Sequence, residues 1–154
     1  MPKTAIRCIR GSILDENLAE GIAIFIPVGL TGIRLDSKDF IFKTTGKPMC
    51  GGAGCYKAIG SGILKYVLYV DNSDIKVSDI EDMRRQINEV LDIFVTMEVK
   101  NIAMNGIRCD DRPDQNVRPE QYLRTFVEEY LAGHPDAFDK ISLVDAHGGF
   151  GETD

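Results

Sequence analysis

The stretch that most constrains the fold is an almost continuous apolar run, IAIFIPV, from Ile22 to Val28. A strand with one face in water alternates apolar and polar residues, and this run does not. Continuous apolar and β-branched residues are typical of a strand that is covered on both faces. The run therefore predicts a layered α/β protein in which other elements pack above and below a sheet.

Further short apolar runs predict strands at residues 4–10, 65–70, 101–104 and 141–144. A helix is expected to begin near Ser78, because Ser78 and Glu81 have the spacing of a capping box. A second helix is expected from Pro119, which suits a first helical turn, to Gly133, which suits a helix end. Strands that alternate with helices in this way predict an α/β sheet with helices on its faces.

Two segments have other local signals. IRLDSKDFIFK, residues 33–43, contains two short β-like runs around a polar DSKD and is predicted to form a hairpin. GSILDENLAEG, residues 11–21, carries both turn and helix-start chemistry. In parallel sheets ligands bind beyond the carboxyl ends of the strands, so these ends are the places to search.

Length and charge limit the kind of protein. A chain of 154 residues suits one domain, which we expect over residues 1–147, with a loosely ordered tail at 148–154. The net charge of -6 argues against nucleic acid or an anionic membrane as a partner. No apolar run approaches the roughly 20 residues of a membrane-spanning helix. We expect a soluble, cytoplasmic protein.

The four cysteines are too few for a disulfide framework and are expected to be buried thiols. Cys50 and Cys55 lack the C-x-x-C spacing of a zinc site, and the two histidines, His134 and His147, lie far downstream. We therefore expect neither a metal ion nor a cofactor.

The glycine cluster MCGGAGCYKAIG, residues 49–60, could be either a phosphate-binding loop or a structural turn. Glycines let several backbone N–H groups approach a phosphate, and a following helix would add its dipole. The cluster matches neither G-x-x-x-x-G-K-[ST] nor G-x-G-x-x-G. Lys57 could add positive charge, although an exposed surface lysine is the commoner explanation.

The polar loop after residues 101–104 is the second candidate. It opens with Asn105, Gly106 and Arg108, and a guanidinium binds phosphate in a bidentate manner. Arg108 could instead pair with Asp110 or Asp111. The acidic cluster of this loop, completed by Asp114, is interpreted as solvated charge because it lacks the pattern of a calcium loop.

In the order of its elements the chain resembles the macro domains, the family that binds ADP-ribose and related nucleotides. The resemblance rests on G-S-I at residues 11–13, similar to the family's G-D-I, on the glycine cluster with A-I at 58–59, and on K-Y-V-L-Y-V at 65–70. The closing unit from 101 to 144 is also similar. The resemblance implies a three-layer α/β/α sandwich with a mixed, mostly parallel central sheet.

The resemblance also implies ligand contacts in three segments, at Ser12, Asp15, Gly51, Gly52, Ala53, Gly54, Cys55, Asn105, Gly106, Ile107 and Arg108. Ser12 stands where the family has an adenine-contacting aspartate, and Asp15 is the nearby substitute. Residues 27–29 contain no asparagine where the family has an asparagine-rich segment. The glycine cluster matches either the family's G-G-G-V loop or a later glycine-threonine segment, and the sequence leaves both open.

Together these features predict a macro-like module that binds ADP-ribose or a related phosphate-bearing small ligand, without a recognisable catalytic set. The alternative is a macro-like scaffold that has lost ligand binding and acts through protein-protein contact or homo-oligomerisation. A hydrolase of ADP-ribose derivatives would require Asp15, His147 or the acidic loop to converge on the ligand.

Overall fold

The computed structural model describes residues 4–26, 35–47, 54–59, 62–71, 80–105, 116–117 and 119–145. In chain order its elements are β1 (Ala5–Arg10), β2 (Gly21–Ile26), α1 (Leu35–Thr45), β3 (Gly54–Lys57), β4 (Tyr66–Asp71), α2 (Ile80–Thr96), β5 (Asn101–Asn105), α3 (Pro119–Gly133) and β6 (Lys140–Asp145).

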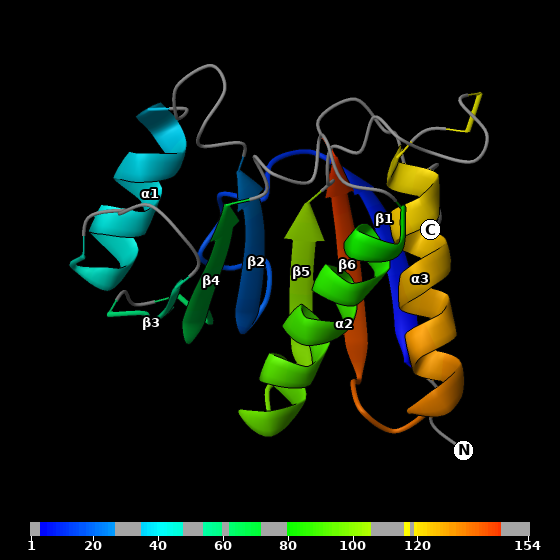
Figure 1. The fold of residues 1–154 in the computed structure, drawn as a ribbon. Helices are drawn as coiled ribbons and strands as arrows, with labels where there is room; N and C mark the ends of the chain where they lie inside the picture. Colours follow the sequence, from blue (N-terminus) through cyan, green and yellow to red (C-terminus); the bar gives the residue numbers. More distant parts are fainter. Residues whose placement is uncertain are drawn as a thin grey trace.

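The described strands form one six-stranded sheet in the order β1-β6-β5-β2-β4-β3 (Figure 1). All neighbouring pairs are parallel except β3 and β4, which are antiparallel. The sheet is therefore mixed and mostly parallel, as predicted.

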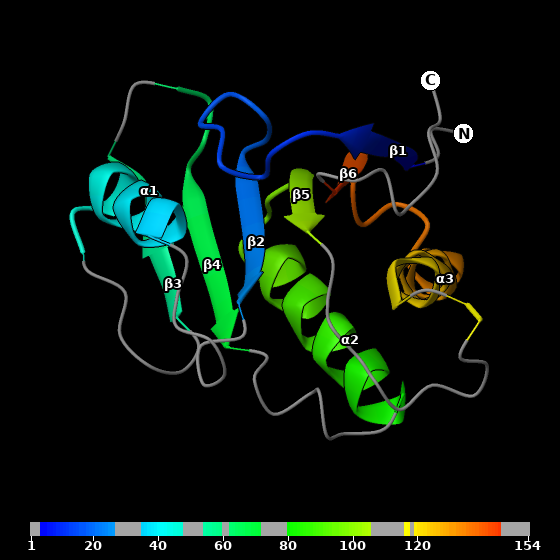
Figure 2. The same cartoon turned by 90° about the horizontal axis from the view of Figure 1, so that it is seen from above.

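Helices cover both faces of the sheet. Seen from above, α1 lies on one face, and α2 and α3 lie on the other (Figure 2). Residues of β2 point alternately into the two layers: Ala23 and Phe25 pack with the α2 and α3 side, and Ile22 and Ile24 pack with the α1 side. This two-sided burial explains the continuous apolar run, and the predicted three-layer α/β/α architecture is confirmed.

The two predicted helices of the second half are confirmed. The buried face of α2 consists of Met83, Ile87, Val90, Leu91 and Phe94, as its helical periodicity predicts. The second helix, α3, runs from the predicted Pro119 to the predicted Gly133. Arg84 of α2 ties them together, because its guanidinium lies 4.4 Å from the centroid of the Phe126 ring and pairs with Glu129. No helix within the described ranges is long and apolar enough to cross a membrane.

The hairpin predicted at residues 33–43 is wrong, because this part of the chain contains helix α1. Two β-branched residues, Thr44 and Thr45, lie at the end of this helix, just beyond the predicted hairpin. Their hydroxyls donate to the carbonyls four residues earlier, of Phe40 and Ile41, both at 2.6 Å. These bonds satisfy the hydroxyls within the helix, and Ile41 is fully buried against the sheet.

The connection from β1 to β2 contains turns and no helix, so its helix-start signal was misleading. It crosses the α1 side of the sheet and buries Ile13 and Ala19 in the same cluster as Ile22 and Ile24. The connection therefore completes, beside α1, the layer that covers this face.

Candidate functional site

The sheet has a topological switch point between β2 and β5. From β2 the chain continues through α1, on one face, toward β3 and β4. From β5 it continues through α3, on the opposite face, to β6. Where the connections from two neighbouring strands leave toward opposite faces, a crevice forms outside the carboxyl ends of the strands. Ligands of α/β proteins bind in this crevice.

Strand pairing also ends early at this point. The β2–β4 ladder extends to Ile26↔Asp71, and the β5–β6 ladder extends to Asn105↔Val144. The β2–β5 ladder, in contrast, ends at Ala23↔Met104. The carboxyl ends of β2 and β5 thus stay paired with their outer neighbours while their mutual pairing stops. We call this opening of the ladder the β2–β5 split.

One side chain bridges the β2–β5 split. The Oδ1 atom of Asn105 accepts a hydrogen bond from the backbone N–H of Phe25 at 2.8 Å, and Nδ2 donates to the carbonyl oxygen of Phe25 at 3.3 Å. Asn105 is half-buried. Its amide therefore supplies the donor and the acceptor that the backbone of Phe25 requires on the side of β5, while β4 pairs with Phe25 on its other side.

Ser12 and Asp15 lie in the connection after β1, and both are exposed. The hydroxyl oxygen of Ser12 accepts a hydrogen bond from the N–H of Leu14 at 3.0 Å. A carboxylate oxygen of Asp15 accepts one from the N–H of Asn17 at 2.8 Å. Both side chains thus stabilise tight turns in this connection. Ser12 lies just beyond the carboxyl end of β1, while Asp15 lies further along, over the α1 side of the sheet.

Gly54 and Cys55 lie on β3, at the edge of the sheet, opposite Tyr69 and Leu68 of β4. The segment behind the glycines is thus a strand, so the helix dipole considered for a phosphate loop does not act on Gly54. This glycine has a packing role instead. A Cβ atom there would lie 3.0 Å from Cε1 of Tyr69, whose ring stacks on Tyr56 with 5.6 Å between centroids.

The two cysteines within the described residues differ in burial, and Cys50 and Cys109 lie outside these residues. Cys8 is buried, as predicted, whereas Cys55 is exposed, contrary to prediction. The sulfur of Cys55 lies 3.8 Å from the sulfur of Met97, at the end of α2. Although Cys55 is exposed as a residue, partial burial of its sulfur raises the pKa of the thiol, which keeps it protonated at neutral pH and makes it a poor nucleophile.

Five of the predicted contacts lie in the described residues: Asn105 in the middle of the sheet, Ser12, Gly54 and Cys55 near its two edges, and Asp15 over the α1 side. Asn105 is on β5, Ser12 follows β1, and Gly54 and Cys55 are on β3. With neighbouring strands about 4.8 Å apart, β1 and β3 are separated by roughly 24 Å. A compact ligand could not reach both edges, and only an extended ligand could contact all three segments.

The remaining predicted contacts lie outside the described residues: Gly51, Gly52, Ala53, Gly106, Ile107 and Arg108. The same holds for His147, the acidic residues 110–114, the asparagine-free segment 27–29 and the tail 148–154. Among the side chains that the structure does describe, no group of three or more His, Cys, Asp or Glu could hold a metal ion.

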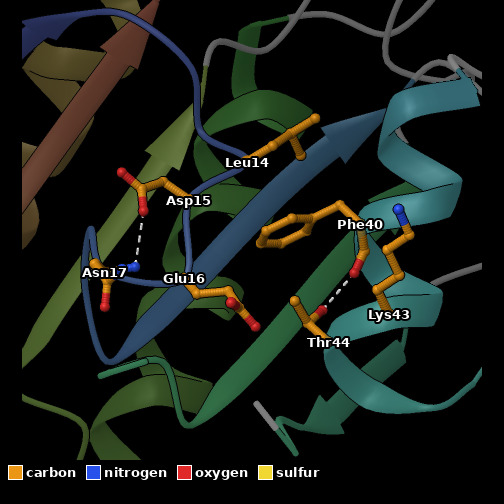
Figure 3. Close-up of a pocket in the computed structure, with 7 residues that line it drawn as sticks. All are labelled: Leu14, Asp15, Glu16, Asn17, Phe40, Lys43 and Thr44. Carbon is orange, nitrogen blue, oxygen red and sulfur yellow. Dashed lines mark hydrogen bonds between the residues drawn. The ribbon is translucent and has the colours of Figure 1, made fainter. Parts of the chain in front are cut away.

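A separate hollow of about 300 Å³ lies between the turn after β1 and helix α1 (Figure 3). Its lining consists of Leu14, Asp15, Glu16, Asn17, Phe40, Lys43 and Thr44. Much of its polar lining is already engaged, since Asp15 binds the N–H of Asn17 and the Thr44 hydroxyl donates to Phe40. The side of the hollow that α1 forms was not expected from the sequence, because the local pattern of residues 33–43 predicted a hairpin. The signal that could have found it is Gly46, which ends α1 with a φ of 71°.

No protein-family model and no curated protein matches the sequence.

Solved structures do match. The macro domain of ganglioside induced differentiation associated protein 2 has a TM-score of 0.68 at 12% identity, over 94% of this chain and 78% of that one. The Trypanosoma brucei macrodomain in complex with ADP-ribose has a TM-score of 0.67 at 14% identity, over 94% and 67%. The macrodomain of Mycobacterium tuberculosis DarG has a TM-score of 0.55 at 10% identity, over 91% and 97%. The chain therefore has a macro-like fold, as the resemblance implied.

Proposed function

We propose that this chain is a macro-like module that binds ADP-ribose, or a related nucleotide, beyond the carboxyl ends of its parallel strands. The observation that carries the proposal is the β2–β5 split, because it opens the sheet at its topological switch point. The structural neighbours include the Trypanosoma brucei macrodomain in complex with ADP-ribose and in complex with ADP, which supports a nucleotide as the ligand.

The chemistry of the predicted contacts suits an extended ligand with a diphosphate. In this proposal the glycines Gly51 and Gly52 offer backbone N–H groups to phosphate oxygens, and Arg108 contributes a bidentate cation. Local donors are needed because the net charge of -6 repels an anionic ligand on average. Ser12 would face the other end of the ligand, near β1, and Asp15 would lie over the α1 side of the sheet.

The proposal includes no catalytic set. The Cys55 thiol is protonated at neutral pH, and the carboxylate of Asp15 is engaged with its own turn. We also propose the cytoplasm as the location of the protein, because its four cysteines are too few for the disulfide framework of a small secreted domain.

Titration calorimetry with ADP-ribose, and with ADP and AMP as comparisons, tests the function. We expect ADP-ribose to bind most tightly, because only it extends past the diphosphate on both sides. If a folded protein binds none of the three, the proposed function is wrong.

A matched pair of arginine variants tests the location. Arg108→Ala should weaken ADP-ribose binding by about tenfold or more, since a charged hydrogen bond contributes roughly 1.5–3 kcal/mol. Arg85→Ala removes the same charge from the exposed side of α2, where Arg85 pairs with Asp82, and should leave the affinity unchanged. Equal affinities of both variants and the unmodified protein would place the ligand elsewhere.

The scaffold alternative has one observation in its favour. Large apolar side chains are exposed on α1 and between β3 and β4, with Phe42, Ile59 and Ile63 at 55%, 69% and 48% exposure. Ile59 lies against the end of α1, where its Cδ1 atom would be 3.4 Å from a Cβ atom at Gly46. Such residues suit contact with another protein chain, and the whole-molecule experiment in the Discussion tests for it.

A further inference from the structure

The side chain of Asn105 offers an inference that rests on the proposed function and extends it. We infer that Asn105 is a positioning residue: its amide replaces the next backbone rung between β2 and β5, and so fixes the width of the β2–β5 split beyond which the ligand binds. The sequence analysis interpreted Asn105 as a ligand contact, and the geometry assigns it this different role.

The first step concerns the backbone groups of Phe25. In a parallel ladder, alternate residues direct both their N–H and their C=O toward the same neighbouring strand. The bonds from the Phe25 N–H and carbonyl to Asn105 show that Phe25 faces β5, two residues beyond the last paired residue, Ala23. Continued pairing would have satisfied these groups with backbone of the following segment. The Asn105 amide satisfies them instead.

The second step concerns distance. A backbone rung holds two strands about 4.8 Å apart. When the partner is a side-chain amide, Cβ and Cγ lie between the two backbones, so the strands must diverge to accommodate them. The amide therefore both satisfies the groups that the split exposes and prevents the split from closing.

The third step concerns rigidity. Phe25 is 3% exposed, and its ring packs into the core under α2 and α3. Asn105 is paired on its other side with Val144 of β6. Both residues of the bridge are thus held in the sheet. A change in the Asn105 amide would therefore move the carboxyl ends of β2 and β5, beyond which the ligand is proposed to bind.

The chemistry requires an amide in particular, because a donor and an acceptor must lie side by side. An ionised aspartate has the same shape but places a second acceptor against the Phe25 carbonyl. A protonated aspartic acid restores the donor. A leucine of similar size offers neither. These three side chains therefore differ in hydrogen bonding while their sizes are similar, so they separate a positioning role of Asn105 from a role in packing alone.

The same strand supplies a matched control. Asn101 stands at the opposite, amino end of β5, and its Oδ1 atom is buried without a hydrogen-bond partner in the structure. Asn101→Asp therefore makes the same substitution in the same strand, away from the split. It should change stability but neither the protection of Phe25 nor the affinity for ligand.

The experiment combines two measurements on Asn105→Asp, Asn105→Leu and Asn101→Asp: amide hydrogen exchange at Phe25 by NMR, and ADP-ribose affinity by calorimetry. Asn105→Leu should speed exchange at Phe25 and weaken binding, each by about tenfold. Asn105→Asp should bind weakly at about pH 8 and recover, relative to the unmodified protein, as the pH falls to about 4, where its carboxyl group gains a proton.

The outcomes separate this inference from the function on which it rests. Absence of binding by the unmodified protein refutes the proposed function, and with it any positioning role. If the unmodified protein binds and Asn105→Leu loses protection at Phe25 but keeps its affinity, the positioning role is wrong. Weaker binding by Asn105→Asp at every pH, with Phe25 still protected, would show that Asn105 contacts the ligand directly and would also overturn the inference.

Discussion

Gly21, the first residue of β2, shows how a single side-chain position limits the packing of a helix on the sheet. A Cβ atom there would lie 2.8 Å from Cε1 of Phe94 and 3.0 Å from Cγ1 of Val99. Both neighbours are buried and rigidly packed, so neither can move aside at low cost. The glycine lets the end of α2 approach the start of the strand.

We expect Gly21→Ala to lower the free energy of unfolding by about 1–3 kcal/mol, the usual cost of overpacking a core. Urea denaturation measures it. Gly133→Ala is the control, because a Cβ atom at Gly133 would meet nothing within 4 Å. A loss of stability at Gly133 as large as at Gly21 would contradict the packing argument.

At the scale of an element, the end of α2 is held by a turn that suits glycine but contains Glu98. The N–H of Val99 donates to the carbonyl of Phe94, and the N–H of Glu98 donates to that of Val95, both at 3.0 Å. This pair of hydrogen bonds requires the residue after the helix to adopt the left-handed backbone conformation. That residue is Glu98, which has a φ of 59°. The helix end therefore contains backbone strain.

Glu98→Gly should raise the free energy of unfolding by about 0.5–1 kcal/mol. Relief of the left-handed conformation contributes roughly 1–2 kcal/mol, and the greater freedom of glycine in the unfolded chain offsets part of it. Thermal and urea unfolding measure the gain. Glu98→Ala keeps the strain and serves as the control, and an equal gain in that variant would show that the glutamate side chain is the cause.

Helices α2 and α3 are joined by a hydrogen bond whose strength depends on pH. The hydroxyl of Tyr130 donates to a carboxylate oxygen of Asp92 at 2.6 Å. Burial, and then the bond to Asp92, raise the pKa of the Tyr130 phenol above its ordinary value. Because the folded pKa is the higher one, the stabilisation is complete below the unfolded pKa of about 10 and is lost as pH rises through the folded pKa.

Tyr130→Phe should therefore lower the free energy of unfolding by about 1 kcal/mol at neutral pH. The difference from the unmodified protein should shrink above about pH 10, where the unfolded phenol ionises. Denaturant titrations between about pH 7 and pH 11 follow it. A difference that stays constant over this range would mean that Tyr130 acts through packing alone.

At the scale of the whole molecule, the two edges of the sheet differ in how much chain they pair. β3 has four residues and pairs with β4, whereas β1 pairs with β6 over six residues. Short edge strands are a common protection against unwanted pairing between sheets. The exposed apolar side chains of Phe42, Ile59 and Ile63 favour association instead. Whether two copies associate depends on which of these two effects is larger.

For an isolated molecule, hydrogen exchange should be fastest in the short edge strand β3 and slowest in the inner strands, β6, β5, β2 and β4, which have strands on both sides. NMR or mass spectrometry at several protein concentrations measures the order. Protection of β3 that grows with concentration would show pairing between copies of the chain, and would favour the scaffold alternative.

The sequence by itself determined the elements whose signals are local. The apolar run of β2 predicted a strand buried on both faces, and the periodic apolar positions and end residues of α2 and α3 predicted both helices. Each of these signals lies within a few turns of chain, so no distant partner is needed to interpret it. The resemblance to macro domains added the layer order, which the structure confirms.

Only the tertiary structure decided the features that depend on distant segments. Helix α1 forms where residues 33–43 have a β-like pattern, because burial of Ile41 and the bonded hydroxyls of Thr44 and Thr45 outweigh local propensity. Asn105 meets Phe25 across 80 positions of sequence. Sheet order brings such residues together, and a local pattern does not encode sheet order, so the β2–β5 split could not be predicted from the sequence.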